Sequence, residues 1–291
     1  MTTTKALAVL NEACSRTSLD PSVAAPLHQH AATLYLFKTD RVVVRLNQDS
    51  DDRARAGTVV ELTRWLTRQG FPSVAPIDVE QPIDVDDYTI TFWRYYPQND
   101  RPKPAAGHLG AMLRQLHALP APPVELRQYQ PLKNFGNSAG ASIALSAHDR
   151  AWLLDRRAEL LGEYEHLDFP LGSGWIHGDA YPGNTLWDGD RVLLGDWDEV
   201  GTGPRELDLV NTHQGARFGR TPAERDAFTG AYGYDVTAWP GFPVLREMRD
   251  LHTLGSYIRL ADSGNEQAAL ELRFRIGTLQ RGDANAQWNA R

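Results

Sequence analysis

The residues from 176 to 209 constrain this chain more than any other stretch. They read IHGDAYPGNTLWDGDRVLLGDWDEVGTGPRELDL. An HGD triplet ends at Asp179, Asn184 follows five residues later, and Asp196 comes after two short apolar runs. Two carboxylates and an amide at these separations predict a polar site built from oxygen atoms.

The turn between the two apolar runs predicts a β-hairpin. A DGD sequence at residues 188–190 separates the runs 186–187 and 192–194. Asp-Gly or Gly-Asp between apolar runs is a strong hairpin signal, because glycine adopts positive φ without a steric penalty. This turn folds Asn184 back beside Asp196, and opposite Cβ atoms of such a ladder lie about 4.5–5.5 Å apart. Oxygen ligands so placed suit Mg²⁺, which takes few protein ligands and fills its shell with phosphate and water.

The order and spacing of Asp179, Asn184 and Asp196 are also those of kinase-type phosphoryl transfer. The motifs HGDAYPGN, GDW and GPRELDL resemble those of the aminoglycoside phosphotransferase family. Its members are small-molecule kinases related to choline kinases and to protein kinases. The resemblance is strong over residues 176–209 and weaker elsewhere. It implies an α+β, bilobal, protein-kinase-like fold, in which a small N-terminal β-sheet lobe carries one helix and a larger C-terminal lobe is mainly helical.

The resemblance further implies roles for individual residues. Asp179 accepts or orients the proton of a substrate hydroxyl, while Asn184 and Asp196 hold Mg²⁺ beside ATP or GTP. His177 orders the loop, and Asp208 of the GPRELDL segment pins it. The last two are therefore expected to support the site without reacting.

A polar segment with three prolines, residues 94–104, marks the clearest boundary in the chain. Under the resemblance it is a hinge between a nucleotide-binding lobe at residues 1–93 and a catalytic and substrate-binding lobe at residues 105–291. Backbone groups around Arg94 and Tyr96 are then expected to bind the adenine.

The predicted strand RVVVRL, residues 41–46, carries a cation within an apolar run. Arg45 is either a surface residue with its stem over the sheet or, under the resemblance, the cation that reaches the nucleotide phosphates. Glu61 is the only acid on the helix expected at residues 54–69, and is the candidate partner of Arg45.

Two other classes of function stay open. Residues 26–32 stand where a kinase carries its glycine-rich loop, yet contain no glycine, which favours a nucleotide-binding protein without turnover. Intact Asp179, Asn184 and Asp196 favour catalysis instead. A metal-dependent hydrolase needs several histidine ligands, and only His177 lies in the key stretch.

Composition narrows the partners and the compartment. The net charge of −7 and the lack of a basic run argue against nucleic acid, and an acidic surface suits either a cationic substrate or simple solubility. With Cys14 as the single cysteine, no intrachain disulfide is possible. No stretch reaches the roughly 18 apolar residues of a membrane span, and the N-terminus lacks a secretory signal. These features predict a cytoplasmic protein and leave its oligomeric state undetermined.

Hydrophobic periodicity predicts the remaining elements. Strands are expected at 33–37, 41–46 and 88–93, and helices at 4–16, 54–69, 106–119, 148–166, 205–217, 222–232, 243–261 and 265–280. Residues 120–140 are expected to form an irregular connector, and a polar tail containing Trp288 follows Gly282.

The acceptor pocket is the least determined part of the site. Asp198 and Glu199 follow Asp196 directly and are either substrate contacts or solvent-exposed turn residues. The later helix with Arg246, Asp250 and His252 either lines the same cleft or, as is more common for a helix with mixed charge, presents a solvated face. An aminoglycoside or another antibiotic is the leading acceptor, and an amino sugar, a choline-like alcohol or a nucleoside metabolite is the alternative.

Overall fold

The computed structural model describes residues 3–29, 33–48, 52–99 and 101–289. The chain divides into two compact units. The first unit comprises Met1–Pro104, Ala118–Arg127 and Gly183–Val200, and the second comprises Ala105–His117, Gln128–Pro182 and Gly201–Arg291. An antiparallel N-terminal sheet and a helical C-terminal region confirm the predicted α+β, protein-kinase-like class. The division at residues 94–104 stays a prediction.

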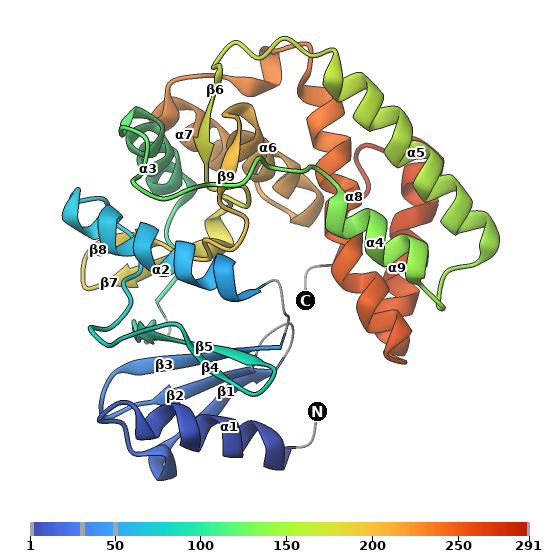
Figure 1. Cartoon of the computed structure of the whole chain (residues 1–291). Helices are drawn as coiled ribbons and strands as arrows, with labels where there is room; N and C mark the ends of the chain where they lie inside the picture. Colours follow the sequence, from blue (N-terminus) through green and yellow to red (C-terminus); the bar gives the residue numbers. More distant parts are fainter. Residues whose placement is uncertain (1–2, 30–32, 49–51, 100, 290–291) are drawn as a thin grey trace. The chain divides into compact units, whose positions relative to one another are not determined.

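The first unit is built on a five-stranded antiparallel sheet of order β1-β2-β3-β5-β4 (Figure 1). Its strands are β1 (Ala25–Gln29), β2 (Thr33–Phe37), β3 (Val42–Asn47), β4 (Ile83–Val85) and β5 (Tyr88–Arg94). The sequence predicted β2, β3 and β5 and missed β1 and β4. Residues 30–32, which end the predicted phosphate loop, lie outside the described part of the chain.

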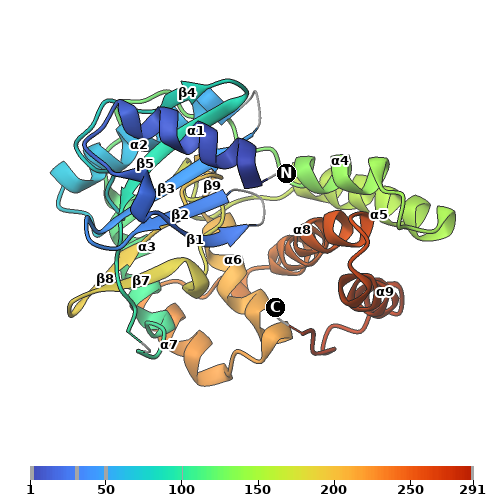
Figure 2. The same ribbon diagram turned by 90° about the horizontal axis from the view of Figure 1, so that it is seen from below.

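Two helices cover opposite faces of this sheet, as Figures 1 and 2 show. Helix α1 (Thr3–Ser15) packs against one face of the sheet. Its Leu10 lies in the same buried hydrophobic cluster as Val44 of β3 and Phe92 of β5. Alternate residues of a strand point to opposite faces, so Arg45 projects from the other face, the side of α2 (Asp52–Arg68). The alternation that builds the apolar core therefore also directs Arg45 away from it.

The predicted hairpin forms and belongs to the first unit. It consists of β7 (Thr185–Asp188) and β8 (Arg191–Leu194), with the expected turn at Gly189, whose φ is +58°. Leu194 fastens it to residues 72–74, since its N–H donates to the Pro72 carbonyl at 2.8 Å and its own carbonyl accepts from Val74 N at 3.0 Å. The same unit holds Gln98 against the hairpin, because its amide exchanges two hydrogen bonds with the Trp187 backbone at 3.0 and 3.2 Å.

The second unit is mainly helical. Its helices are α3 (Ala106–Ala118), α4 (Lys133–Ala141), α5 (Ala147–Glu165), α6 (Glu206–Gln214), α7 (Pro222–Tyr232), α8 (Phe242–Asp262) and α9 (Glu266–Gln280). Strands β6 (Ser173–Ile176) and β9 (Gly201–Pro204) form a short antiparallel pair. Helix α8 is the centre of the packing and contacts α4, α5, α6 and α9 (Figure 1). The expected irregular connector at residues 120–140 is wrong in part, because α4 begins within it.

Short 3-10 helices complete the described chain, at Pro21–Val23, Pro182–Asn184, Gly215–Phe218 and Val236–Ala238. No helix of the described chain combines the length and the apolar character that crossing a membrane requires.

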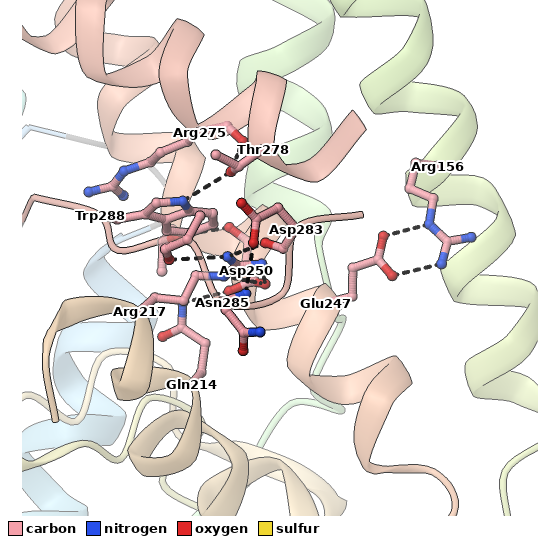
Figure 3. Close-up of polar contacts among 12 residues, drawn as sticks. Arg156, Gln214, Arg217, Glu247, Asp250, Arg275, Thr278, Asp283, Asn285 and Trp288 are labelled. Atoms are coloured by element: carbon pink, nitrogen blue, oxygen red, sulfur yellow. Dashed lines mark hydrogen bonds and ion pairs between the residues drawn. The ribbon is translucent and has the colours of Figure 1, made fainter. Parts of the chain in front are cut away.

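The segment that carries Trp288, predicted as a polar tail, is anchored in the second unit (Figure 3). Trp288 is only 4% exposed, and its indole N–H donates to the Thr278 hydroxyl at 3.1 Å. The guanidinium of Arg217 stacks on this indole at 4.3 Å and forms a buried ion pair with Asp250 at 2.8 Å. The apolar ring and the cation beneath it explain why this polar sequence packs into the unit.

Candidate active site

The hairpin register determines how closely two of the predicted metal ligands approach. Thr185 pairs with Leu194, so Asn184 lies opposite Gly195, one residue before Asp196. Gly195 N donates to the Asn184 carbonyl at 2.9 Å. A Cβ at Gly195 would lie 3.1 Å from the Val74 side chain, so the close approach favours glycine. Asn184 and Asp196 are therefore brought to one end of the hairpin, with a register that is shifted by one residue from the predicted pairing.

Asp196 has an unusual backbone conformation. Its φ is +59°, in the left-handed region that costs a non-glycine residue on the order of 1 kcal/mol. The following residue, Trp197, is 1% exposed, packs edge-on against Phe71 and donates its indole N–H to the Leu194 carbonyl at 3.3 Å. The buried ring fixes the turn, and the exposed carboxylate of Asp196 is presented beside it.

Arg45 contacts the same turn. Its Nη1 donates to Asp198 Oδ1 at 2.8 Å, and its Nη2 forms an ion pair with Asp198 Oδ2. Its Nε donates to the Asn47 side chain at 3.1 Å. The candidate partner Glu61 was wrong, because its side chain is exposed on α2 and the guanidinium is turned toward Asp198. No local pattern predicted this pair, since 153 residues separate its members.

Asp179 lies in the second unit, beside a cation that the sequence did not reveal. Arg249 Nη2, from α8, donates to Asp179 Oδ1 at 2.5 Å, with side-chain exposures of 12% and 20%. Arg249 stands one turn after Arg246 on the same helix, but helical spacing does not single it out as the partner of Asp179, 70 residues away. Asp250, one of the three residues that the sequence offers on this helix, forms the buried pair with Arg217.

Asp208 pins the loop that carries Asp179, in the position predicted for it. Its carboxylate accepts from His177 N and Gly178 N, both at 2.8 Å, and contacts His117 Nε2 at 3.0 Å. Burial acts to raise the pKa of the Asp208 carboxyl, but the His117 hydrogen bond and charge and the His177 contacts outweigh it, so this pKa is lowered. Asp208 is fully buried and serves as a fixed anion for the loop.

Histidine side chains support this anchor from two directions. His177 is fully buried, and its Nδ1 accepts from Asp179 N at 3.3 Å. His117, on α3, also contacts the Tyr232 hydroxyl through Nδ1 at 2.9 Å. Burial, with the Asp208 charge, raises the pKa of Tyr232 to about 12, so its hydroxyl keeps its proton. No local sequence pattern indicates His117 or Tyr232, because their roles arise from packing between α3, α6 and α7.

The remaining predicted residues occupy three different environments. Arg94 ends β5 with an exposed side chain, and its N–H donates to the Ala75 carbonyl at 2.9 Å. Tyr96 is buried, and its hydroxyl accepts from Ala75 N at 3.1 Å. Glu199 is partly exposed in the turn after Asp198. Adenine binding at Arg94 and Tyr96 and substrate contact by Asp198 and Glu199 stay predictions. The hydrolase alternative requires a group of three or more His, Cys, Asp or Glu side chains that could hold a metal ion. The described part of the chain contains no such group.

Solved structures with the same fold include kinases of several small molecules. An amicoumacin kinase in complex with AMP-PNP, Ca²⁺ and Ami is 12% identical, with a TM-score of 0.73 over 96% of this chain and 94% of that one. A microcompartment-associated aminopropanol kinase is 16% identical, with a TM-score of 0.66 over 96% and 98%. Spectinomycin phosphotransferase APH(9)-Ia, in complex with ADP and spectinomycin, is 19% identical, with a TM-score of 0.59 over 90% of both chains.

Among curated proteins, no sequence matches the chain. The model of one protein family, described as the phosphotransferase enzyme family, matches residues 24–250, which include the HGD triplet, the hairpin and the GPRELDL segment. The resemblance drawn from these motifs is thereby confirmed. This chain belongs to the phosphotransferase enzyme family, the aminoglycoside phosphotransferase (APH) family of small-molecule kinases.

Proposed function

We propose that this protein transfers the γ-phosphate of ATP to a hydroxyl group of a small molecule, with Mg²⁺ as the cofactor. The observation that carries the proposal is the contact between Arg45 and Asp198. It brings the cation of β3 to the turn that bears Asp196, although the two segments lie far apart in the sequence. This contact supports the proposal, because the residues proposed to bind phosphate and metal then lie in one unit, as the chemistry requires.

The groups at the hairpin suit a hard divalent cation. Asn184 and Asp196 offer amide and carboxylate oxygens, the ligand types that Mg²⁺ takes together with substrate phosphates. When bound, Mg²⁺ neutralises phosphate charge and leaves the transferred group open to attack. The exposed carboxylate of Asp196, held on its left-handed turn, supports this assignment.

Arg45 has the role of binding nucleotide phosphate. Its guanidinium presents a planar fork of donors that fits phosphate as well as carboxylate. In the described structure Asp198 occupies this fork. Asp198 therefore holds the Arg45 guanidinium at this turn until phosphate replaces it, and Glu199 keeps the role of a proposed acceptor contact.

Asp179 has the role of accepting the proton of the acceptor hydroxyl, or of orienting that hydroxyl. A carboxylate is sufficient, because phosphoryl transfer requires little covalent work from the protein. The loop contacts with Asp208 and His177 fix the backbone of Asp179, and Arg249 fixes its carboxylate. Positioning is the main contribution of these groups.

The proposed acceptors are small hydroxylated molecules, with aminoglycosides and other antibiotics as the first class to test. Amino sugars, choline-like alcohols and nucleoside metabolites are the second. We place the reaction in the cytoplasm, where ATP is available and where a chain with one cysteine needs no disulfide. Nucleic acid is not a proposed partner of a chain with a net charge of −7.

The test is a coupled ADP-release assay with Mg-ATP and a panel of these acceptors. Asp179→Asn and Asp196→Asn should each reduce turnover by at least about 100-fold, the scale of a lost general base or metal ligand. Asp190→Asn is the matched control, because this acid lies fully exposed in the turn of the same hairpin and should leave turnover unchanged.

The outcomes separate the competing functions. Mg-ATP binding without ADP release for any acceptor would support the alternative of a nucleotide-binding protein without turnover. Failure to bind Mg-ATP would overturn the proposal. Equal losses in Asp190→Asn and Asp196→Asn would show that the hairpin, and not the ligand position, is what the substitutions disturb.

A further inference from the structure

A pocket lies beside Asp179 within the second unit. Its wall begins at Gly178, the residue before Asp179, and continues along α8 through Met248 and Arg249. Most of its lining is apolar and is contributed by α6, α8 and the segment before α4. A molecule seated in this pocket lies against Gly178, the residue before Asp179, and against the Asp179 partner Arg249, and it places an apolar surface against these helices.

The charge of this pocket is not what a polycation requires. Arg249 contributes a guanidinium, and no Asp or Glu is found among the described residues that line the pocket. His252 adds no charge at neutral pH, because burial, reinforced by the Arg249 charge, lowers the pKa of its imidazole to about 4. Two carboxylates of the described chain contact lining residues, and both are already bound: Asp179 pairs with Arg249, and Asp208 accepts from Gly178 N at 2.8 Å and contacts His117.

Two donors at the pocket lack protein partners. The amide nitrogen of Asn211, on α6, is buried without a hydrogen-bond partner in a residue that is only 5% exposed. Arg249 Nε is likewise buried and unpartnered. An unsatisfied buried donor costs about 1–3 kcal/mol, so a bound molecule that offers acceptor oxygens would relieve this cost.

We propose that the acceptor substrate is a neutral or anionic hydroxylated molecule with an apolar face, whose other polar groups are carbonyl, ether or carboxylate oxygens directed to Asn211 and Arg249. This inference rests on the proposed function, since it assigns the pocket beside Asp179 to the acceptor. It directs the search away from acceptors that carry several ammonium groups, because these meet donors and a guanidinium in the pocket.

Three matched probes test the inference without nucleotide: phenyl β-D-glucoside, phenyl β-D-glucuronide and phenyl 2-amino-2-deoxy-β-D-glucoside. They share the apolar ring and most hydroxyls, and differ in a neutral, carboxylate or ammonium substituent. Isothermal titration should show the glucuronide binding about tenfold more tightly than the amino sugar, the scale of one charge-assisted hydrogen bond. Arg249→Gln should reduce this preference to less than about threefold, while Arg249→Lys should retain its direction.

Arg246→Gln is the matched control, because Arg246 stands one turn earlier on the same helix and is not part of the pocket lining. It should preserve the wild-type preference. Tighter binding of the amino sugar, a preference that Arg249→Gln leaves unchanged, or failure of all three probes to bind would each overturn the inference. Circular dichroism and thermal unfolding of each variant show whether the fold is intact.

Failure of the inference can be distinguished from failure of the proposed function. Probe binding is measured without ATP, so the expected order together with no ADP release for any acceptor would overturn only the transfer reaction. ADP release with acceptors rich in ammonium groups, together with the reversed probe order, would overturn only the assignment of the acceptor class.

Discussion

Replacing Asp208 with Asn tests how the loop of Asp179 is held in place. The carboxylate accepts hydrogen bonds from His177 N and Gly178 N, and it contacts His117 through the oxygen that also serves His177. An asparagine has one acceptor oxygen and an NH₂ group of nearly the same shape. In either orientation of the amide, one backbone N–H of the loop faces a nitrogen that cannot accept its hydrogen bond.

The expected cost follows from these contacts. A buried donor without a partner costs about 1–3 kcal/mol, and a hydrogen bond to a charged group is worth about 1.5–3 kcal/mol. Asp208 is fully buried, so solvent cannot replace the lost contacts. Since one of the oxygens retains its bonds, we expect Asp208→Asn to lower the free energy of unfolding by about 3–5 kcal/mol, the range for breaking a buried charged pair.

Urea unfolding at neutral pH measures this loss through the midpoint at an unchanged m-value. Asp262→Asn is the matched control. The Asp262 carboxylate also accepts from two backbone N–H groups, of Ile143 and Ala144, and from the Ser142 hydroxyl, but all three bonds end on Oδ1. An asparagine keeps this oxygen, and the side chain lies partly exposed at the end of α8, so we expect a loss below about 1 kcal/mol there. Equal losses in the two variants would refute the argument, because the second acceptor oxygen of the buried Asp208 would then add nothing to the loop anchor.

Three further predictions concern other parts of the chain. The pKa of His252 is lowered to about 4, below its unfolded value near 6.5, so the free energy of unfolding should fall by about 2 kcal/mol as the pH drops from 7.5 to 5, the window in which the unfolded chain binds the extra proton. Chemical denaturation should show a smaller fall in His252→Gln, and an unchanged fall would contradict the assignment. Burial, with a smaller effect from Asp20, raises the pKa of the Cys14 thiol to about 11, so a disulfide reagent should modify the native protein at least about 100-fold more slowly than the urea-unfolded chain. Comparable rates would show that α1 does not shield the thiol. Trp288→Ala should lower the free energy of unfolding, measured in urea, by about 3–5 kcal/mol, because the indole ring is buried against Arg217. A loss below about 1 kcal/mol would mean that the C-terminal segment does not stabilise the unit.

Local sequence patterns predicted the elements whose residues repeat clearly. The alternation in residues 33–37 gives β2 with the burial pattern that a half-covered strand requires. Helix α4 was missed because its sequence, KNFGNSAGA, contains two glycines and two asparagines, which are poor helix formers. Its buried Phe135 and Ala139, and its packing against α5 and α8, stabilise a helix that local propensity does not favour.

The sequence could propose site residues to the extent that they lie in one segment. The hairpin followed from its turn and brings Asn184 close to Asp196, while the roles of Asp179, Asn184 and Asp196 stay predictions from their spacing. The charged partners could not, because Asp198 and Arg249 are defined by contacts across 153 and 70 residues. Such pairs depend on how strands and helices pack, and a single sequence contains no periodic signal for them.

The exposures of the two ion pairs suggest different functions for them. The pair of Arg45 and Asp198 is 27% and 30% exposed, a setting in which an ion pair contributes about 0–1 kcal/mol. A polyphosphate carries more negative charge than one carboxylate, so under the proposed function Arg45 can exchange Asp198 for phosphate at little cost. The pair of Arg249 and Asp179 is only 12% and 20% exposed, and opening it would leave two charges poorly solvated. Arg249 is therefore expected to stay with Asp179 and orient its carboxylate, while the weaker pair at the hairpin opens when a nucleotide binds.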